Sequence, residues 1–365
     1  MKKNNTIEVL RFIFTMYVVV CHFYTAFAWV YRRPGNGWFA VEFFFVLSGY
    51  LLMHSCARYE GDGATPPWQQ AWTVLKGKYL RMLPVWFTAC CVYFAGEVLS
   101  GAYPLRTLPK TFAESFPVFL MLVEPDTFAS FAIYYSWYVP AMLIAFAALL
   151  PLICAGRRRF THCIAPLIVF CGLGYLWHTH GTIMVLEQSW VGVTWVRTVR
   201  ALAEISLGCI AYEVSQWLRS RCAARVNRQG RLLFTALGLA GVGIPLYWMT
   251  FRLPKELQLP GLMLMAAGVA VIFSGAGLFE RMFRGRFWGW LGQISFALYL
   301  GQGVPYIMID HLYGQLPDKV FFWLFIAAAV VSGLAIHYAA ILLVRLWRML
   351  RGWFLRAFFQ PEAET

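Results

Sequence analysis

Two residues on the first long apolar stretch of the chain, RFIFTMYVVVCH, could do chemistry inside a membrane: Arg11 and His22. On an α-helix, eleven residues turn through about 1100° and rise about 16 Å, so both side chains leave the same face at different depths. A cation and an imidazole are costly inside a hydrophobic span, and such residues usually face a protein interior or an aqueous cavity. Residues of this kind often mark a functional path, so we take His22 and Arg11 as candidate functional residues.

A structural role is the alternative for both residues. Glu8 precedes Arg11 by three positions and can pair with it on one helical face, and an arginine near a helix end can extend its side chain to the membrane surface. His22 lies too deep to reach the surface, but a hydrogen-bonded core histidine would need no catalytic function.

The second apolar stretch, WFAVEFFFVLSGYLL, returns from the opposite side and brings Glu42 to about the depth of His22. A carboxylate beside an imidazole fixes its tautomer and raises its basicity, as in a catalytic triad. We therefore predict that Glu42 orients His22, with a carboxylate that only supports packing as the alternative. Ser48 and Gly49 follow outside any nucleophile-elbow pattern, and small residues of this kind usually permit close helix packing.

The segment KYLRMLP places Lys78 and Arg81 three positions apart on one face at the start of the third span. Two neighbouring cations can grip the phosphates of a cytosolic cofactor. Anchoring of the helix end at the cytoplasmic surface explains the same pair equally well.

Three further charges, Arg197, Arg200 and Glu204, enter the sixth span, and Arg200 and Glu204 have the spacing of an ion pair. Intramembrane charge makes them candidates for contacts with a substrate, and a buried structural ion pair is the competing interpretation.

The elements that carry these residues are predicted to be membrane-spanning helices. The chain of 365 residues is 60% hydrophobic and only 13% charged, far from the roughly 25% charge of a soluble domain. We predict an all-α polytopic membrane protein of about ten spans, each of about 20 apolar residues. Their ranges are 7–30, 38–56, 82–100, 131–154, 162–179, 194–217, 231–250, 259–279, 288–312 and 320–344.

The net charge of +14 would suggest a nucleic-acid partner in a soluble protein. Here the basic residues fall in alternate loops, which the positive-inside rule explains, so we expect no nucleic acid and predict cytoplasmic N and C termini. Arg32 and Arg33 are the exception to this pattern.

The segment 101–130 is apolar but short and broken by proline, and we interpret it as external or re-entrant.

The chain is predicted to form one transmembrane domain over 1–344, followed by a basic cytoplasmic tail over 345–365, which can extend the last helix as a surface anchor or serve as a stop-transfer flank. The first helix is expected to be retained rather than cleaved as a signal, because Glu8, Arg11 and His22 interrupt its apolar run. Most of the nine cysteines lie within predicted spans and are expected to be buried apolar residues. No cysteine or histidine spacing indicates a metal site.

Several blocks of the sequence together resemble the membrane acyltransferase-3 family. They are Arg11 with ten residues before His22, VEFFFVLSGYLL, KYLRMLP, SWYVPAML at 136–143 and GQISFALYLGQ at 292–302. The resemblance implies transfer of an acyl group, usually acetyl, from cytosolic acyl-coenzyme A to a hydroxyl of an extracytoplasmic polysaccharide, glycolipid or lipid-linked sugar. It also implies a multi-pass protein of the bacterial cytoplasmic (inner) membrane with no bound cofactor, and polysaccharide-assembly proteins as partners.

Roles implied by the resemblance fall on matching positions. His22 is the catalytic histidine, either a general base or an acyl carrier, and Arg11 is its catalytic motif partner. The acyl donor is expected to bind near Arg11, Lys78 and Arg81. Trp137 and Tyr138 match an aromatic motif that suits a sugar or the donor arm, with aromatic packing as the alternative. Three positions depart from the family pattern: Lys78 replaces an arginine, Glu42 an aspartate and Gln302 a histidine. Gln302 cannot titrate but can hydrogen-bond a sugar hydroxyl.

Two other classes of function remain open from the sequence. In a secondary transporter, Glu8, Arg11, His22, Glu42 and Glu204 would form a proton or substrate path, and a structural membrane partner of a polysaccharide-assembly system would show no activity when isolated. The acceptor, the acyl group, the choice between a general base and an acyl-histidine, and the oligomeric state are likewise open.

Overall fold

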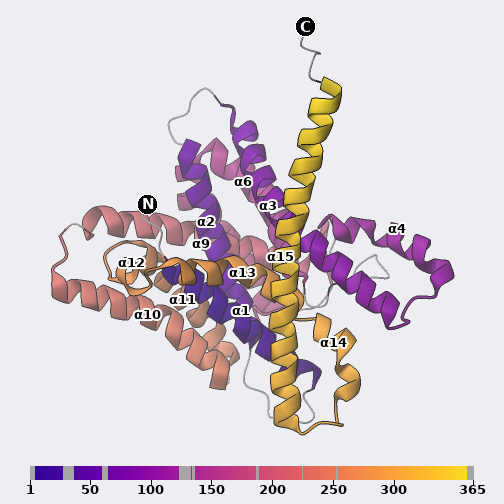
Figure 1. The fold of residues 1–365 in the computed structure, drawn as a ribbon. Coiled ribbons are helices and arrows are strands. Elements are labelled where there is room, and N and C mark those ends of the chain that lie inside the picture. The colour runs from indigo at the N-terminus through magenta and orange to yellow at the C-terminus, as the bar shows by residue number, and fades with distance from the viewer. Residues whose placement is uncertain are drawn as a thin grey trace.

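The structure, a computed structural model, describes residues 5–27, 37–59, 65–122, 133, 136–185, 189–223, 225–251 and 254–359. Within these residues the fold is a bundle of long helices (Figure 1). The long helices are α1 (Asn5–Ala26), α2 (Ala40–Cys56), α3 (Pro67–Leu99), α6 (Tyr138–Ala155), α8 (Ala165–His180), α9 (Val196–Arg221), α10 (Arg228–Phe251), α11 (Gln258–Phe273), α13 (Arg286–Gly301) and α15 (Asp318–Phe359).

Shorter elements connect them. They are the helices α4 (Leu108–Phe119), α7 (Arg157–Arg159), α12 (Phe279–Met282) and α14 (Val304–Met308), the π-helical turn η4 (Phe160–Ile164), and the 3₁₀ turns η1 (Gly37–Phe39), η2 (Ala57–Tyr59), η3 (Leu105–Thr107), η5 (Lys255–Leu257) and η6 (Asp310–Leu312). Strands β1 (Trp190–Val191) and β2 (Thr194–Trp195) form a small antiparallel hairpin that directly precedes α9 in the chain.

Each predicted span overlaps one of the long helices, and eight helical segments of the described residues are long and apolar enough to cross a membrane. The prediction of an all-α membrane protein is therefore confirmed. Helix α9 falls outside the eight because it carries several charges, and α13 because it has only 16 residues. The count of ten spans and the cytoplasmic position of the termini stay predictions.

Helix α9 forms the centre of the bundle, packed against α2, α6, α8 and α11. It approaches α2 most closely where two glycines meet backbone: a Cβ on Gly49 would collide with the Ile205 carbonyl, and one on Gly208 with the Val46 carbonyl. Small residues at such a crossing let helices pack without a polar seam. The crossing fixes the rotation of both helices, and hence the direction of every side chain on them.

The second arrangement that positions candidate residues is the packing of α1 against α13. Gly292 of α13 lies directly against the Glu8 side chain of α1, and Phe14 of α1 stacks on Phe43 of α2 with ring centroids 4.1 Å apart. Helix α1 is therefore held between α2 and α13.

The predicted span 288–312 is too long, because α13 ends at Gly301 and the chain turns into α14. Gly303 lies against the Tyr93 hydroxyl, with no room for a Cβ, and that hydroxyl donates a hydrogen bond of 2.8 Å to the Leu300 carbonyl. Pro305 lacks an N–H and cannot continue the helical hydrogen-bond pattern. The turn places Gln302 at the end of α13, inside the bundle.

Helix α4, within the segment interpreted as external or re-entrant, has 12 residues, about 18 Å, and is too short to cross a membrane. It folds back beside α3 (Figure 1), where Trp86 Nε1 donates a hydrogen bond of 2.7 Å to the Val118 carbonyl and Phe94 contacts Phe112. Its depth in a membrane stays a prediction, and residues 123–130 lie outside the described residues.

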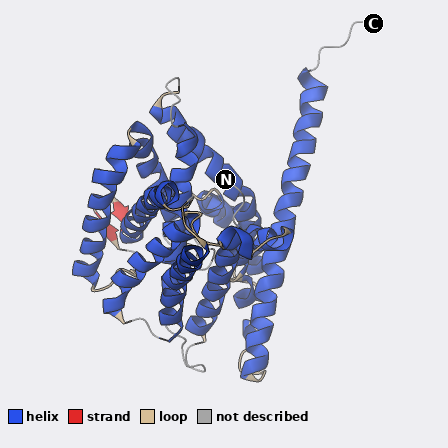
Figure 2. Cartoon of the chain, turned by 90° about the vertical axis from the view of Figure 1, so that its left-hand side faces the viewer, coloured by secondary structure: helices blue, strands red, loops and turns tan. Residues whose placement is uncertain are grey.

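Helix α15 continues past the predicted boundary at residue 344 as one helix of 42 residues, about 63 Å long. Figures 1 and 2 show its C-terminal part extending beyond the bundle. The segment RLWRMLRGWFLRAFF contains no proline and many strong helix formers, which explains the continuity. Residues 345–359 of the predicted tail therefore continue the helix of the last span, and a separate function for the tail stays a prediction.

Candidate active site

His22 of α1 is buried and hydrogen-bonded to the residue that ends α13. Its Nδ1 lies 2.8 Å from Gln302 Oε1, and both side chains are almost fully buried. An amide oxygen only accepts hydrogen bonds, so this contact places the proton on Nδ1 and the lone pair of the neutral ring on Nε2. Gln302 thereby sets the tautomer that a general base requires.

The other end of the same amide offers a donor. Gln302 Nε2 is buried and has no hydrogen-bond partner among the described residues. An orphaned N–H of this kind is costly to leave unpaired, and it can be satisfied by the oxygen of a bound substrate. One side chain can therefore orient the base and also polarise or stabilise an oxygen beside it.

The prediction that Glu42 orients His22 is wrong. Glu42 Oε2 instead accepts a hydrogen bond of 2.5 Å from Arg200, whose Nε lies 3.1 Å from Glu204. The reason lies in the close α2–α9 crossing, which points Glu42 toward α9 rather than toward α1. The predicted Arg200–Glu204 pair is present, but it contains a third member that spacing on one helix could not show.

The buried charges form a triad of one guanidinium between two carboxylates, all with 0% exposed side chains. Arg200 also donates to the Val185 carbonyl over 3.3 Å. Glu42 Oε1 and Glu204 Oε2 are buried, and no described residue forms a hydrogen bond with either oxygen. Burying charge is tolerated only when it is paired and hydrogen-bonded. The two orphaned oxygens mark a place where a hydroxyl or a proton can be taken up.

Aromatic side chains adjoin this triad. Trp137 lies against both arginines, with its ring centroid 5.2 Å from the Arg197 guanidinium carbon and 5.4 Å from that of Arg200. Such cation–π contacts stabilise buried guanidinium groups. The structure therefore brings together three predicted substrate-binding residues, Trp137, Arg197 and Arg200.

Tyr138 lies one residue further on and faces a different neighbour. Its hydroxyl is 3.0 Å from the Ser48 hydroxyl, and both lie 3.3 Å from the Met142 sulfur. Its ring packs between Phe45 and Tyr299. The Ser48 hydroxyl is therefore engaged by Tyr138 and Met142.

Arg11 pairs with Glu8, as its spacing predicted. The two side chains lie 3.2 Å apart and are both partly exposed. Arg11 is separated from His22 by about 16 Å along α1, so the two residues occupy different levels of the bundle. The contact of Glu8 with Gly292 connects this ion pair to α13.

Lys78 and Arg81 lie at another level, near the end of α2. Lys78 Nζ is 5.3 Å from the centre of the Phe146 ring. The like charges of Arg81 and Arg58 repel it, and Arg81 itself is exposed. Along α3, Lys78 is about 22 Å from Tyr93, which adjoins Gln302. A ligand that reaches both levels needs a long, thin arm.

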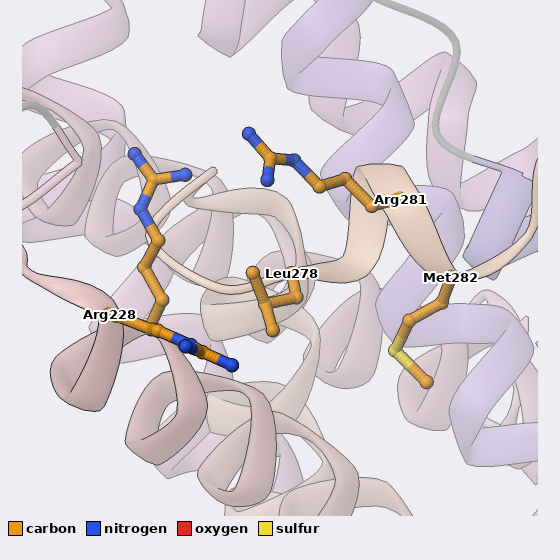
Figure 3. Close-up of a pocket in the computed structure, with 5 residues that line it drawn as sticks. Arg228, Leu278, Arg281 and Met282 are labelled. Carbon is orange, nitrogen blue, oxygen red and sulfur yellow. The ribbon is translucent and has the colours of Figure 1, made fainter.

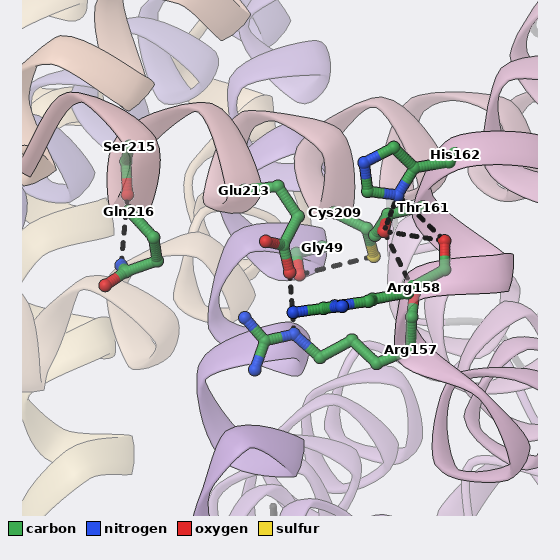
Figure 4. Close-up of polar contacts among 9 residues, drawn as sticks. All are labelled: Gly49, Arg157, Arg158, Thr161, His162, Cys209, Glu213, Ser215 and Gln216. Atoms are coloured by element: carbon green, nitrogen blue, oxygen red, sulfur yellow. Dashed lines mark hydrogen bonds and ion pairs between the residues drawn. The ribbon is translucent and has the colours of Figure 1, made fainter. Parts of the chain in front are cut away.

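A polar contact that the sequence did not indicate lies at this same end. Figure 4 shows Arg157 of α7 reaching the Glu213 carboxylate of α9 at 2.6 Å, and Arg157 also lies 5.1 Å from the Tyr212 ring centroid. The two residues are 56 positions apart, so only the three-dimensional fold pairs them. In contrast to Arg157, three other basic side chains at this end have no carboxylate partner among the described residues: Arg58, Lys78 and Arg81.

Within the described ranges, no three His, Cys, Asp or Glu side chains gather as metal ligands. All nine cysteines are free.

The family model described as "Acyltransferase domain" matches residues 4–342, nearly the whole chain. No curated protein and no solved structure matches the chain.

Proposed function

Because this chain belongs to the acyltransferase-3 family, we propose that it is an integral membrane O-acyltransferase. It would move an acyl group, acetyl by preference, from cytosolic acyl-coenzyme A to a hydroxyl of an extracytoplasmic polysaccharide or glycolipid. The observation that carries the proposal is the buried contact between His22 Nδ1 and Gln302 Oε1, because it gives a membrane-embedded imidazole the tautomer of a general base. The bacterial inner membrane is the location that fits an acyl donor on one side and a glycan on the other.

In the proposed reaction, His22 Nε2 takes the proton from the acceptor hydroxyl as its oxygen attacks the thioester carbonyl. The tetrahedral oxyanion then collapses, the carbon–sulfur bond breaks, and the thiolate leaves with the proton that His22 returns. The products are an acyl ester and coenzyme A. The unpartnered Gln302 Nε2 supports a second role for this residue, in which it would donate a hydrogen bond to the oxyanion.

A covalent route uses the same atoms in a different order. His22 Nε2 attacks the thioester first, the carbon–sulfur bond breaks, and coenzyme A leaves as the thiolate. The acceptor hydroxyl then attacks the acyl-imidazolium, which regenerates neutral His22, and the hydroxyl proton passes, in net, to the thiolate. In this route Gln302 stabilises the oxyanion in both half-reactions. The acyl group would then wait on the protein between donor and acceptor.

The donor would enter at the level of Arg58, Lys78 and Arg81. Three cations without a carboxylate partner in the described structure suit a ligand that carries several phosphates. The rise of about 22 Å from Lys78 to Tyr93 along α3 matches the architecture of coenzyme A, in which a long flexible arm separates the phosphates from the thioester. Arg11 lies at an intermediate level, where it can contact that arm or support its path.

The acceptor would bind near Trp137, Tyr138, Arg197 and Arg200. Aromatic faces suit sugar rings, and buried guanidinium groups suit polar or anionic substituents. Glu42 then acts through Arg200, as a positioning residue, rather than on His22.

A proton-coupled transporter is the second candidate, and one observation favours it. The Glu42–Arg200–Glu204 triad contains two carboxylates for one guanidinium, which is the arrangement expected where a proton binds and leaves. Such intramembrane groups are common in proton relays.

Reconstituted protein supplied with acetyl-coenzyme A separates the two functions. An acyltransferase releases free thiol in proportion to acetyl ester formed on added glycan, whereas a transporter leaves the thioester intact and moves solute. Comparison of surface glycans from cells with and without the gene identifies the acceptor through lost ester-linked acyl groups. An intact thioester, together with unchanged glycan esters, would exclude the proposed enzyme.

A further inference from the structure

A cavity of about 560 Å³ lies where α10 begins beside α12, away from the candidate active site. Its lining consists of Arg228, Arg231, Leu278, Arg281 and Met282. Figure 3 shows that Arg228 and Arg281 extend from two separate elements. The positive-inside pattern assigns this end of α10 to the cytoplasmic face. The cavity combines a strongly basic rim with apolar side chains.

The three arginines are available to a ligand. In the described part of the chain none of them forms an ion pair with a carboxylate, and Arg228 and Arg281 are exposed. The start of α10 is also fixed, because Asn227 Oδ1 accepts a hydrogen bond of 2.9 Å from the Gly230 N–H. Guanidinium groups bind phosphate oxygens with two parallel hydrogen bonds, so the cavity is suited to a phosphate.

Apolar surface continues from the cavity along the outside of α10. Leu232 and Leu233 directly follow Arg231 and are 52% and 59% exposed, and Met282 on the rim is 42% exposed. Exposed leucines on a predicted spanning helix face acyl chains rather than water. A ligand with a phosphate at one end and hydrocarbon at the other fits this sequence of surfaces, whereas a free anion would use only the arginines.

We propose that the cavity binds the phosphate headgroup of an anionic phospholipid from the adjoining leaflet. Basic pockets beside spanning helices on the cytoplasmic side bind such headgroups. The site would also have a structural consequence, because Thr6 of α1 donates a hydrogen bond of 2.9 Å to the Phe279 carbonyl of α12. A lipid held by Arg281 therefore fixes α12 against the first turns of α1, the helix that carries Arg11 and His22.

The test compares two triple variants with the same loss of charge. One is Arg228→Gln/Arg231→Gln/Arg281→Gln in the cavity, and the control is Arg345→Gln/Arg348→Gln/Arg351→Gln on the projecting part of α15. Delipidated full-length protein is titrated with phosphatidylglycerol, with phosphatidylcholine as the neutral lipid and with inorganic pyrophosphate as the soluble phosphate. Binding is measured by native mass spectrometry and by the shift in Tm.

The cavity variant is expected to bind phosphatidylglycerol more weakly by on the order of 100-fold, since three basic contacts near a membrane surface are lost. The control variant should bind within a few-fold of the unmodified protein. Equal loss in both variants would show that net charge alone attracts the lipid and would overturn the site, as would binding of pyrophosphate without phosphatidylglycerol. Arg281→Glu serves as a single variant if the triple variant does not fold, and undiminished lipid binding by it would equally reject the proposal.

Discussion

His22 and Gln302, 280 positions apart, meet in a buried hydrogen bond of 2.8 Å between Nδ1 and Oε1. The contact joins α1 to the end of α13, and it fixes the tautomer of the His22 imidazole. The Gln302 amide does not ionise, so it can hold the ring without changing its own charge. The amide also retains a donor, Nε2, for a second task.

Variants of this pair separate the two tasks. His22→Ala should abolish acyl transfer, while His178→Ala, at an exposed position on α8, should leave it unchanged. Gln302→Glu retains an oxygen beside Nδ1 but loses the Nε2 donor, and removal of an oxyanion donor lowers kcat by roughly 100- to 1000-fold. The measurement is kcat and KM for acetyl-coenzyme A in reconstituted protein. Full activity in Gln302→Glu would exclude the oxyanion role and leave only the orienting one.

The proposed donor site predicts an effect on KM rather than on kcat. Arg81→Ala should raise the KM for acetyl-coenzyme A by about 10- to 100-fold, because a hydrogen bond to a charged phosphate is worth roughly 1.5–3 kcal/mol. Lys76→Ala, five residues earlier on another face of α3, is the control with the same loss of charge. Raised salt should weaken the binding of acetyl-coenzyme A to the control variant and to the unmodified protein alike. A matching rise in KM for both variants would indicate general electrostatic attraction instead of a site.

The helices could be predicted from the sequence because each span requires about 20 apolar residues, and every predicted range overlaps a helix. Their ends were less predictable. The break after Gly301 depends on the Tyr93 hydroxyl from another helix. The continuity of α15 depends on a basic segment whose composition is typical of a tail outside the last span. Both are set by neighbouring groups rather than by hydrophobicity.

The candidate site was only partly predictable for a related reason. Periodicity on one helix correctly predicted the Glu8–Arg11 and Arg200–Glu204 pairs, since their partners are one turn away. It could not predict the partner of Glu42, because α2 is apolar on nearly every side and its rotation is set by the approach of Gly49 and Gly208 to backbone carbonyls. Gln302 was predicted to contact substrate, and its contact with His22 appears only when both ends of the chain are brought together.

The buried triad predicts unequal effects on stability. Arg200→Met should destabilise the protein by about 3–5 kcal/mol, because it leaves two carboxylates buried without a cation. Glu42→Gln should cost much less, since Arg200 keeps Glu204 as a one-to-one partner. Thermal unfolding in detergent, followed by tryptophan fluorescence, measures both. Equal losses of stability would mean that the two carboxylates are not competing for one charge.

The α2–α9 crossing predicts that an added methyl group is harmful at two glycines and harmless at a third. Gly49→Ala and Gly208→Ala place a Cβ against backbone carbonyls that cannot move aside, and overpacking of this kind costs about 1–3 kcal/mol or more. Gly243→Ala on α10 is the control, since nothing lies within 4 Å of its Cβ position and alanine favours a helix. The comparison is made by Tm under one set of detergent conditions. Separation of α2 from α9 should also lower acyl transfer, through displacement of Glu42 from Arg200.

The contact between Gly292 and Glu8 predicts a suppressor. Gly292→Ala should destabilise the protein and displace the Glu8–Arg11 pair, because the new methyl group would occupy the position of the Glu8 side chain. In a Glu8→Ala background that space is empty, so the same substitution should be nearly neutral, and the two changes should be strongly non-additive. Tm and acyl transfer of the four proteins in the cycle provide the measurement. Additive effects would show that Gly292 is required for some other contact. Recovery of stability without recovery of activity would show that Arg11 needs its ion pair with Glu8 for its function.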